Sequence, residues 1–221
     1  TKVADLAHRF GLTSIPDHPG GSLALGAYEV TPLELAAAYQ VLQSGGGQTR
    51  PYLIARITDA RGQVLYFHPA SAAVPVYPTF QAAQMVQMMR GVILAGTGKE
   101  AAFGRLAAGK TGTSQNHRDA WFVGFTPDWL CAVWVGNDDG RPMAKVTGGQ
   151  IPAQIWRGFM SAAHKGLPDT EFAWFPALPP PLYVEEPAPP PADGDLGPVR
   201  RNAMASRDGR IWLPPGAELS E

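Results

Sequence analysis

Residues 104–114, G-R-L-A-A-G-K-T-G-T-S, carry the side chains best suited to chemistry, and they fit two different patterns. The first part of this run fits G-x-x-x-x-G-K-[ST], the P-loop that cradles nucleotide phosphates with backbone N–H groups and a lysine. If the run is instead an extended strand, Lys110 places a positive charge beside the hydroxyls of Thr111 and Thr113. An open strand edge with those groups can bind a peptide and its carboxylate. The neighbouring residues decide between phosphate and peptide binding.

The surroundings of residues 104–114 do not suit a P-loop, which needs a buried strand leading in and a helix leading out. Residues 96–103 are broken by glycine and partly charged. Residues 112–119 are poor in helix formers and lack a periodic apolar face. The chain continues instead into an apolar run at 120–126. We therefore interpret 107–114 as a strand and keep a nucleotide-binding module only as the least favoured alternative.

As a strand, the K-T-G-T segment offers the groups that acyl transfer on a peptide requires. Lys110 brings a positive charge to a substrate carboxylate and to a proton relay. The hydroxyls of Thr111 and Thr113 can hydrogen-bond the carboxylate, and the backbone N–H of Thr113 can supply half of an oxyanion hole. Gly112 lets a bound backbone come close. The plainer alternative is a surface strand with a solvated lysine and threonines that merely favour β-structure.

Longer runs around this strand carry a resemblance to a known family. They read S-L-A-L-G-A-Y-E-V-T-P-L-E-L-A-A-A-Y, K-T-G-T-S-Q-N-H-R-D-A-W-F-V-G-F-T-P, V-W-V-G-N-D-D and T-G-G-Q-I-P-A-Q-I-W-R-G-F-M, in that order. From about Val3 to about Gly166 the chain resembles the transpeptidase domain of class A penicillin-binding proteins. The resemblance makes Lys110 and Thr113 catalytic residues, and Thr111, Gly112 and Thr113 substrate-binding residues.

The resemblance also implies what the protein acts on and where. Such domains cross-link peptidoglycan stem peptides through a serine acyl-enzyme and are acylated by β-lactam antibiotics. They usually belong to bifunctional glycosyltransferase/transpeptidases, anchored at the periplasmic face of the bacterial inner membrane beside other proteins of cell-wall synthesis. A non-catalytic scaffold of the same fold is the alternative that the sequence leaves open.

The chain departs from the family because two motifs, S-x-x-K and S-x-N, are missing upstream of K-T-G. No serine in the chain has a lysine three residues later. The one S-x-N, at residues 114–116, directly follows K-T-G-T, and we interpret it as a polar turn. We therefore expect the C-terminal part of a longer enzyme, with the nucleophile outside this chain and no activity in the fragment alone.

Composition fits one domain without a cofactor. The 221 residues are 45% hydrophobic, and the net charge of −1 gives no electrostatic case for binding nucleic acid. The single cysteine, Cys131, lies in an apolar run and is expected to be a buried thiol. The five histidines show no metal-binding spacing, and His117 is expected to be a solvated turn residue. No metal, and no run of roughly 18 apolar residues that could span a membrane, is expected.

The pattern of helices and strands predicts an α/β fold of the α+β type, with an antiparallel sheet flanked by helices. The family resemblance implies that this is the penicillin-binding/serine β-lactamase-like fold, truncated at its N-terminus. The sheet should contain adjacent strands with Lys110 on an open edge. The predicted strands are 53–58 and 63–67, paired as a hairpin, then 107–114, 120–126 and 130–137. The predicted helices are 2–10, 32–44, 79–94 and 152–166.

Local signals give details within these helices. Thr31, Pro32 and Glu34 form a capping box with proline at the first helical position, and Thr79 could cap the next helix. In the helix at 79–94, the methionines are expected to fill the core beside other apolar residues; the set is Met85, Met88 and Met89 with Phe80, Ala83 and Val92. In the helix at 152–166, one apolar face is expected to contain Ile155, Trp156, Phe159 and Ala163.

The chain is predicted to contain three regions. Residues 1–175 form the C-terminal part of the transpeptidase domain. Residues 176–199 contain two runs of three prolines and should be an extended or disordered linker, because such a segment cannot form a packed core. Residues 200–221 form a short tail without an assigned role.

Overall fold

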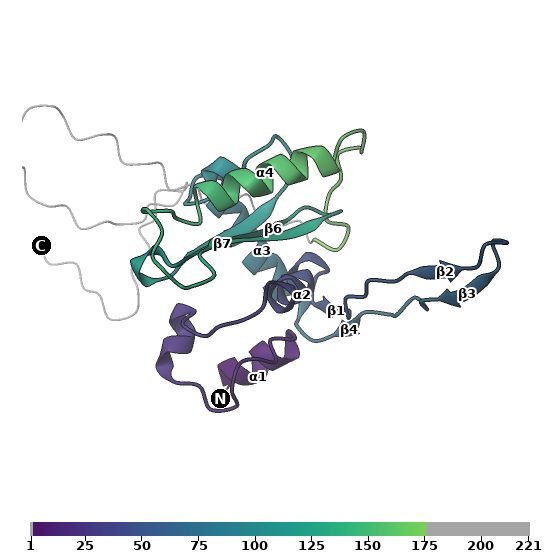
Figure 1. Cartoon of the computed structure of the whole chain (residues 1–221), viewed down its shortest axis with the longest axis horizontal. Helices are drawn as coiled ribbons and strands as arrows, with labels where there is room; N and C mark the ends of the chain where they lie inside the picture. The colour runs from purple at the N-terminus through teal and green to yellow at the C-terminus, as the bar shows by residue number, and fades with distance from the viewer. Residues whose placement is uncertain (1, 176–221) are drawn as a thin grey trace, which may run out of the picture. The chain divides into compact units, whose positions relative to one another are not determined.

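The computed structural model describes residues 2–175, in which helices and strands follow one another along the chain (Figure 1). The helices are α1 (Lys2–Arg9), α2 (Pro32–Gln43), α3 (Thr79–Leu94) and α4 (Ile151–Ala163), with short 3₁₀ turns at Gly21–Leu25, Lys99–Ala101 and Gln115–His117. The strands are β1 (Gly47–Gln48), β2 (Arg56–Thr58), β3 (Val64–Phe67), β4 (Val74–Pro75), β5 (Ala108–Thr113), β6 (Asp119–Phe125) and β7 (Leu130–Gly136). The predicted linker and tail lie outside the described residues.

The central sheet has the order β5-β6-β7, and both of its pairings are antiparallel. Lys110 lies opposite Val123, and Gly112 lies opposite Trp121. Within residues 2–175, β5 pairs with β6 alone, so it is an edge strand, and Lys110 is exposed on it. The predicted order of the three strands and the open edge at Lys110 are therefore confirmed.

Helices cover both faces of this sheet (Figure 1). Successive side chains of a strand point to opposite faces, so the two faces of β6 bury different residues. Phe122 packs with Trp156 of α4, and their ring centroids are 5.2 Å apart. Phe125 packs with Leu42 of α2 and with apolar side chains of α3 on the other face. The sheet is the middle layer between α4 and the pair α2 and α3.

Strands β2 and β3 form the predicted hairpin, which extends away from the helices and the central sheet (Figure 1). Asp59 fixes its turn, because one carboxylate oxygen accepts the N–H groups of Arg61 and Gln63 at 2.8 and 2.9 Å. Every residue of the two strands is exposed. The paired part of β2 begins three positions later than the sequence predicted.

The capping box of α2 is confirmed, and it does more than begin a helix. Thr31 Oγ1 accepts the N–H of Glu34, whose carboxylate accepts the N–H of Thr31. The same carboxylate accepts the hydroxyls of Thr13 and Ser14 at 2.8 and 2.9 Å, and so ties the segment after α1 to α2. The N–H of Thr31 and the hydroxyl of Thr13 lower the pKa of Glu34 from 4.5 to about 2.

Predictions for α3 were wrong in two respects. The helix begins at Thr79, and its N-cap is Pro78, so Thr79 provides no cap. Of the three methionines only Met89 is buried, while Met88 is 61% exposed and belongs to an outer stripe with Phe80. One side of α3 faces the sheet and α2, and the methionine spacing alone does not say which side that is.

The predicted face of α4 was right for Trp156, which is fully buried, and wrong for Ile155 and Phe159. The helix begins at Ile151 rather than Pro152, and its buried residues are Pro152, Ala153, Trp156 and Met160. Ile155 and Phe159 are about half exposed, at 49% and 52%. The sequence of α4 contains two neighbouring apolar stripes, and only the one that contains Trp156 meets the sheet. Along residues 2–175, the structure contains no helix with the length and apolarity that a membrane crossing requires.

Glu34→Gln is expected to lower the free energy of unfolding at neutral pH by roughly 0.5–2 kcal/mol, the scale of a lost cap interaction. A carboxyl whose pKa is lowered by folding stabilises the fold above its unfolded pKa and loses that effect as pH falls through the folded value. Wild-type stability should therefore decline between pH 4.5 and about 2, and the variant should decline less.

Thermal melts followed by circular dichroism across this pH range provide the measurement. Asp138→Asn is the matched control, because Asp138 is an exposed carboxylate outside this network. Equal pH dependence in wild type and Glu34→Gln would contradict the assignment.

Candidate active site

The site predicted from the sequence lies on β5, whose burial falls along its length. Ala108 and Gly109 are buried, whereas Lys110 and Thr113 are exposed. Gly109 lies against an aromatic ring, because a Cβ there would be 2.7 Å from the Cζ of Phe122. The first two residues of β5 are therefore packed in the core, and the K-T-G-T residues that follow are more exposed.

Lys110 and Thr111 lie on opposite faces of β5. The Nζ of Lys110 donates to the backbone carbonyl of Thr111 at 2.7 Å, so the ammonium group lies along the strand. The hydroxyl of Thr111 lies 2.7 Å from the hydroxyl of Thr97, which precedes the 3₁₀ turn after α3. Lys110 thus provides a charged donor, and the next residue of the strand, Thr111, provides a hydroxyl that is paired with Thr97.

Thr113 shares the face of Thr111, and its hydroxyl oxygen accepts the N–H of Gly148 at 3.1 Å. Gly148 belongs to residues 147–150, the loop that leads into α4. Sequence reasoning identified Thr111 and Thr113 but missed Thr97 and Gly148, their hydrogen-bond partners. Only the T-G-G in the sequence could have pointed to this loop, because paired glycines often mark close backbone contacts.

The S-x-N at residues 114–116 is a polar turn, as predicted. Ser114 Oγ donates to a carboxylate oxygen of Asp119 and accepts the N–H of Asp119, both at 2.8 Å. Asn116 and His117 have positive φ values of 60° and 54°. His117 is not simply solvated, because its Nδ1 lies 3.1 Å from the carbonyl oxygen of Val146. His117 lies in a turn, as predicted, but it is half-buried and hydrogen-bonded rather than freely solvated.

The nucleotide-binding alternative is wrong, because Lys110 lies inside an antiparallel strand and not at the start of a helix. Residues 115–117 form only a single 3₁₀ turn before the chain returns as β6. Among residues 2–175, no group of three or more His, Cys, Asp or Glu side chains could hold a metal ion. Cys131 is half-buried on β7, and burial raises the pKa of its thiol.

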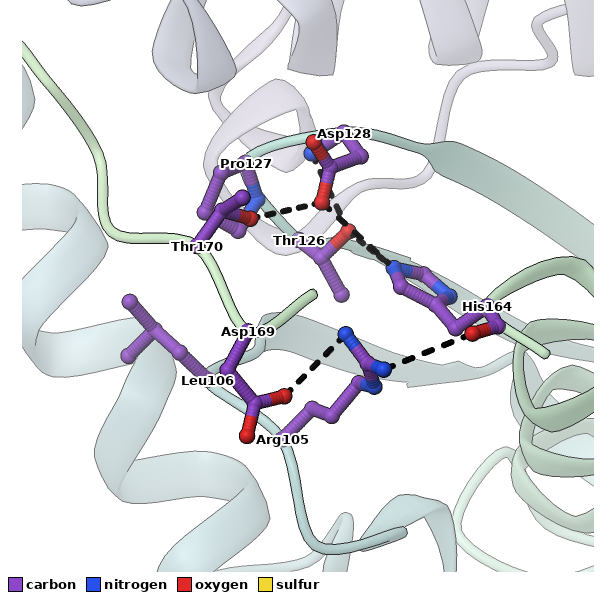
Figure 2. A pocket seen from close by; sticks show the side chains of 8 residues that line it. All are labelled: Arg105, Leu106, Thr126, Pro127, Asp128, His164, Asp169 and Thr170. Carbon is purple, nitrogen blue, oxygen red and sulfur yellow. Dashed lines mark hydrogen bonds and ion pairs between the residues drawn. The ribbon is translucent and has the colours of Figure 1, made fainter. Parts of the chain in front are cut away.

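A second polar cluster lies at the C-terminal end of α4 (Figure 2). Arg105 donates to the backbone carbonyls of His164, Leu167 and Pro168 and pairs with Asp169 at 3.1 Å. The cavity beside it has a volume of about 10 Å³, so it holds one water molecule at most and no substrate. Arg105 instead ties the residues before β5 to the end of α4.

His164 is the buried centre of this cluster, and its hydrogen bonds define its tautomer. A carbonyl oxygen only accepts, so Nδ1 donates to Met160 at 2.8 Å. In the neutral ring, Nε2 then accepts the hydroxyl of Thr126 at 2.9 Å. Thr126 in turn accepts the N–H groups of Asp128 and Trp129 in the turn after β6. The cluster joins β6 to α4 and has a structural role.

Known proteins share this fold. The family described as the penicillin binding protein transpeptidase domain matches residues 16–161, and the chain belongs to that family. Penicillin-binding protein 1A of Aquifex aeolicus is 38% identical over 172 residues, 77% of this chain and 23% of that protein. The chain therefore spans about a quarter of the length of this relative.

Solved structures of penicillin-binding proteins have the same fold as this chain. Penicillin-binding protein 1A from Haemophilus influenzae matches with a TM-score of 0.69 and 26% identity, over 76% of this chain and 31% of that one. PonA1 from Mycobacterium tuberculosis, in complex with penicillin V, matches with a TM-score of 0.68 and 31% identity, over 79% of this chain and 51% of that one. These relatives confirm the fold and the resemblance to class A penicillin-binding proteins.

Arg105→Ala is expected to lower the free energy of unfolding by about 1–3 kcal/mol, because a charged donor to three carbonyls is lost. Arg157→Ala, which removes an exposed arginine from α4, should change it by no more than about 0.5 kcal/mol. Urea unfolding of both variants tests the role of the cluster, and similar midpoints for the two would contradict it.

Proposed function

We propose that this chain is the C-terminal part of a peptidoglycan D,D-transpeptidase that acts through a serine acyl-enzyme. The observation that carries the proposal is the edge strand β5, which pairs with β6 alone among residues 2–175 and exposes Lys110 and Thr113. Peptides bind to such edges by main-chain hydrogen bonds, and the side chains select the ligand. Membership of the transpeptidase family and the penicillin V complex of the Mycobacterium tuberculosis relative support it.

In the proposed reaction a serine from outside this chain attacks a carbonyl carbon of a stem peptide. The new C–O bond forms as the serine proton passes to a base, and the amide C–N bond breaks as the leaving amine takes a proton. An amine of a second stem peptide then attacks the acyl-enzyme. A new C–N bond forms as the C–O bond to the serine breaks, and a proton from the amine passes to the serine oxygen, which completes the cross-link. A β-lactam would follow the first step, because its strained amide is attacked in the same way.

The residues of β5 have separate roles in this proposal. Lys110 draws the substrate carboxylate and supports the proton relay by its charge. Thr111 and Thr113 hydrogen-bond the carboxylate with their hydroxyls, and the N–H of Thr113 supplies one donor to the developing oxyanion. Gly112 has no side chain to obstruct the bound backbone. The serine, the second motif, a glycosyltransferase domain and a membrane anchor at the periplasmic face would belong to the rest of the enzyme.

The 221-residue chain alone should form no covalent adduct with a penicillin. Nucleophilic catalysis requires a serine with its base within hydrogen-bond reach, and no serine of this chain has lysine three positions later. Incubation with a fluorescent penicillin, followed by intact-mass measurement, is the test. An adduct on any serine would show that the nucleophile lies within this chain.

In the complete enzyme, Lys110→Ala should slow acylation by penicillin roughly 10²–10³-fold, the usual effect of removing one transition-state interaction. Thr113→Ala should slow it less, because the backbone N–H of Thr113 remains. Lys110 is exposed, so Lys110→Ala should change stability by only about 0.5 kcal/mol. Thr113→Ala also removes the acceptor of the Gly148 N–H and should cost about 1–3 kcal/mol.

The second-order acylation rate and the melting temperature are measured together for both variants. Lys165→Ala is the control, because it removes an exposed lysine beyond the end of α4. A folded Lys110→Ala enzyme that is acylated at the wild-type rate would refute the assignment of the site.

A further inference from the structure

We infer that residues 147–150, the T-G-G-Q loop, are a positioning element that orients the hydroxyls of β5 toward a substrate carboxylate. This inference rests on the proposed function. It concerns Gly148 above all, which contacts β5 from the face opposite to Lys110 and donates to Thr113. Gly148 would touch no substrate itself and would act through Thr113.

The T-G-G-Q loop lies directly on the backbone of the sheet. A Cβ on Gly148 would be 2.2 Å from the carbonyl oxygen of Trp121 and 2.5 Å from that of Gly112. A Cβ on Gly149 would be 2.1 Å from the carbonyl oxygen of Thr97. Neither Gly148 nor Gly149 has a positive φ. These glycines are therefore required by space and not by backbone conformation, because Gly148 lies against β5 and β6 and Gly149 lies against Thr97.

The hydrogen bond from Gly148 determines what the Thr113 hydroxyl can do. A hydroxyl has one proton to donate, and its oxygen lone pairs accept. Because Thr113 Oγ1 accepts the N–H of Gly148, its proton remains available for an acceptor outside the loop. An ionised carboxylate only accepts hydrogen bonds, so it is a suitable partner for a hydroxyl whose proton is free to be donated.

Thr97 and Thr111 form a second arrangement of the same kind. Their hydroxyl oxygens are 2.7 Å apart, so one donates to the other and a single proton is left for an outside acceptor. Gly149 packs against the carbonyl of Thr97 and thereby holds it beside β5. The loop thus influences both hydroxyls of the K-T-G-T segment, one directly and one through Thr97.

The loop is itself held in one conformation. The side chain of Gln150 accepts the N–H of Thr147, and the N–H of Gln150 donates to the carbonyl of Thr147, both at 3.1 Å. The chain then continues into α4, where Trp156 is completely buried. The position of Gly148 is consequently set by the core.

The test compares two probes in the complete enzyme, a penicillin with its free carboxylate and the methyl ester of the same penicillin. In Gly148→Ala the rate with the carboxylate should fall at least about tenfold, as expected when a hydrogen bond to a charged group is lost. The rate with the ester should stay within about twofold of the wild-type rate. The ratio of the carboxylate rate to the ester rate should therefore fall in Gly148→Ala. Gly158→Ala is the matched control, because a Cβ there meets open space on α4.

Thr97→Val gives a second variant that adds no bulk and should keep the fold. It should reduce the preference for the carboxylate, and Thr97→Ser should restore it. Equal losses with both probes in Gly148→Ala would mean that the loop only packs, and would overturn the inference. If Gly148→Ala does not fold, Thr97→Val decides, and an unchanged preference overturns the inference.

The outcomes separate this inference from the proposed function. A complete enzyme that the free-carboxylate penicillin does not acylate overturns both. An enzyme that is acylated with a strong preference for the carboxylate, unchanged in Gly148→Ala and Thr97→Val, overturns only the role of the loop.

Discussion

The burial of Trp156 beneath the central sheet is the constraint on which the rest of the structure depends. An indole in a core needs a partner for its N–H, and Trp156 donates to the carbonyl of Gly124 at 3.1 Å. Its ring meets Phe122 and Phe103 edge to face. Gly124 must be a glycine here, because a Cβ would lie 2.9 Å from the indole. These contacts fix α4 against β6, and both ends of α4 take their places from that.

The two ends of α4 then meet β5 and the residues before it in different ways. At the N-terminal end, the T-G-G-Q loop packs on the last two residues of β5, Gly112 and Thr113, through Gly148. At the C-terminal end, Arg105, three positions before β5 begins, binds backbone carbonyls of the residues that directly follow the helix. The segments at the two ends of α4 thus contact the candidate strand at its exposed end and just before its buried start. Among residues 2–175, every buried side-chain polar atom has a hydrogen-bond partner.

The sequence predicted the features that depend on residues close to one another along the chain. The capping box at Thr31 and Glu34 is a local pattern, and the apolar runs of β6 and β7 are continuous. The exposed face of α4 and the exposure of Met88 were not predictable, because each depends on what packs against a helix with two apolar stripes. In the site, Lys110 and Thr113 follow from a motif. Thr97 and Gly148 do not, because they lie 14 and 35 positions from their partners.

The falling burial along β5 has a consequence for local stability. Opening a segment costs least where the fewest buried contacts must break, so β5 should open more readily near Thr113 than near Ala108. Under the proposed function, the end that should open more readily is the end that would receive a peptide. A peptide added to this edge would supply new backbone hydrogen bonds there, and binding would suppress the opening. The ligand would therefore complete the order of the strand that recognises it.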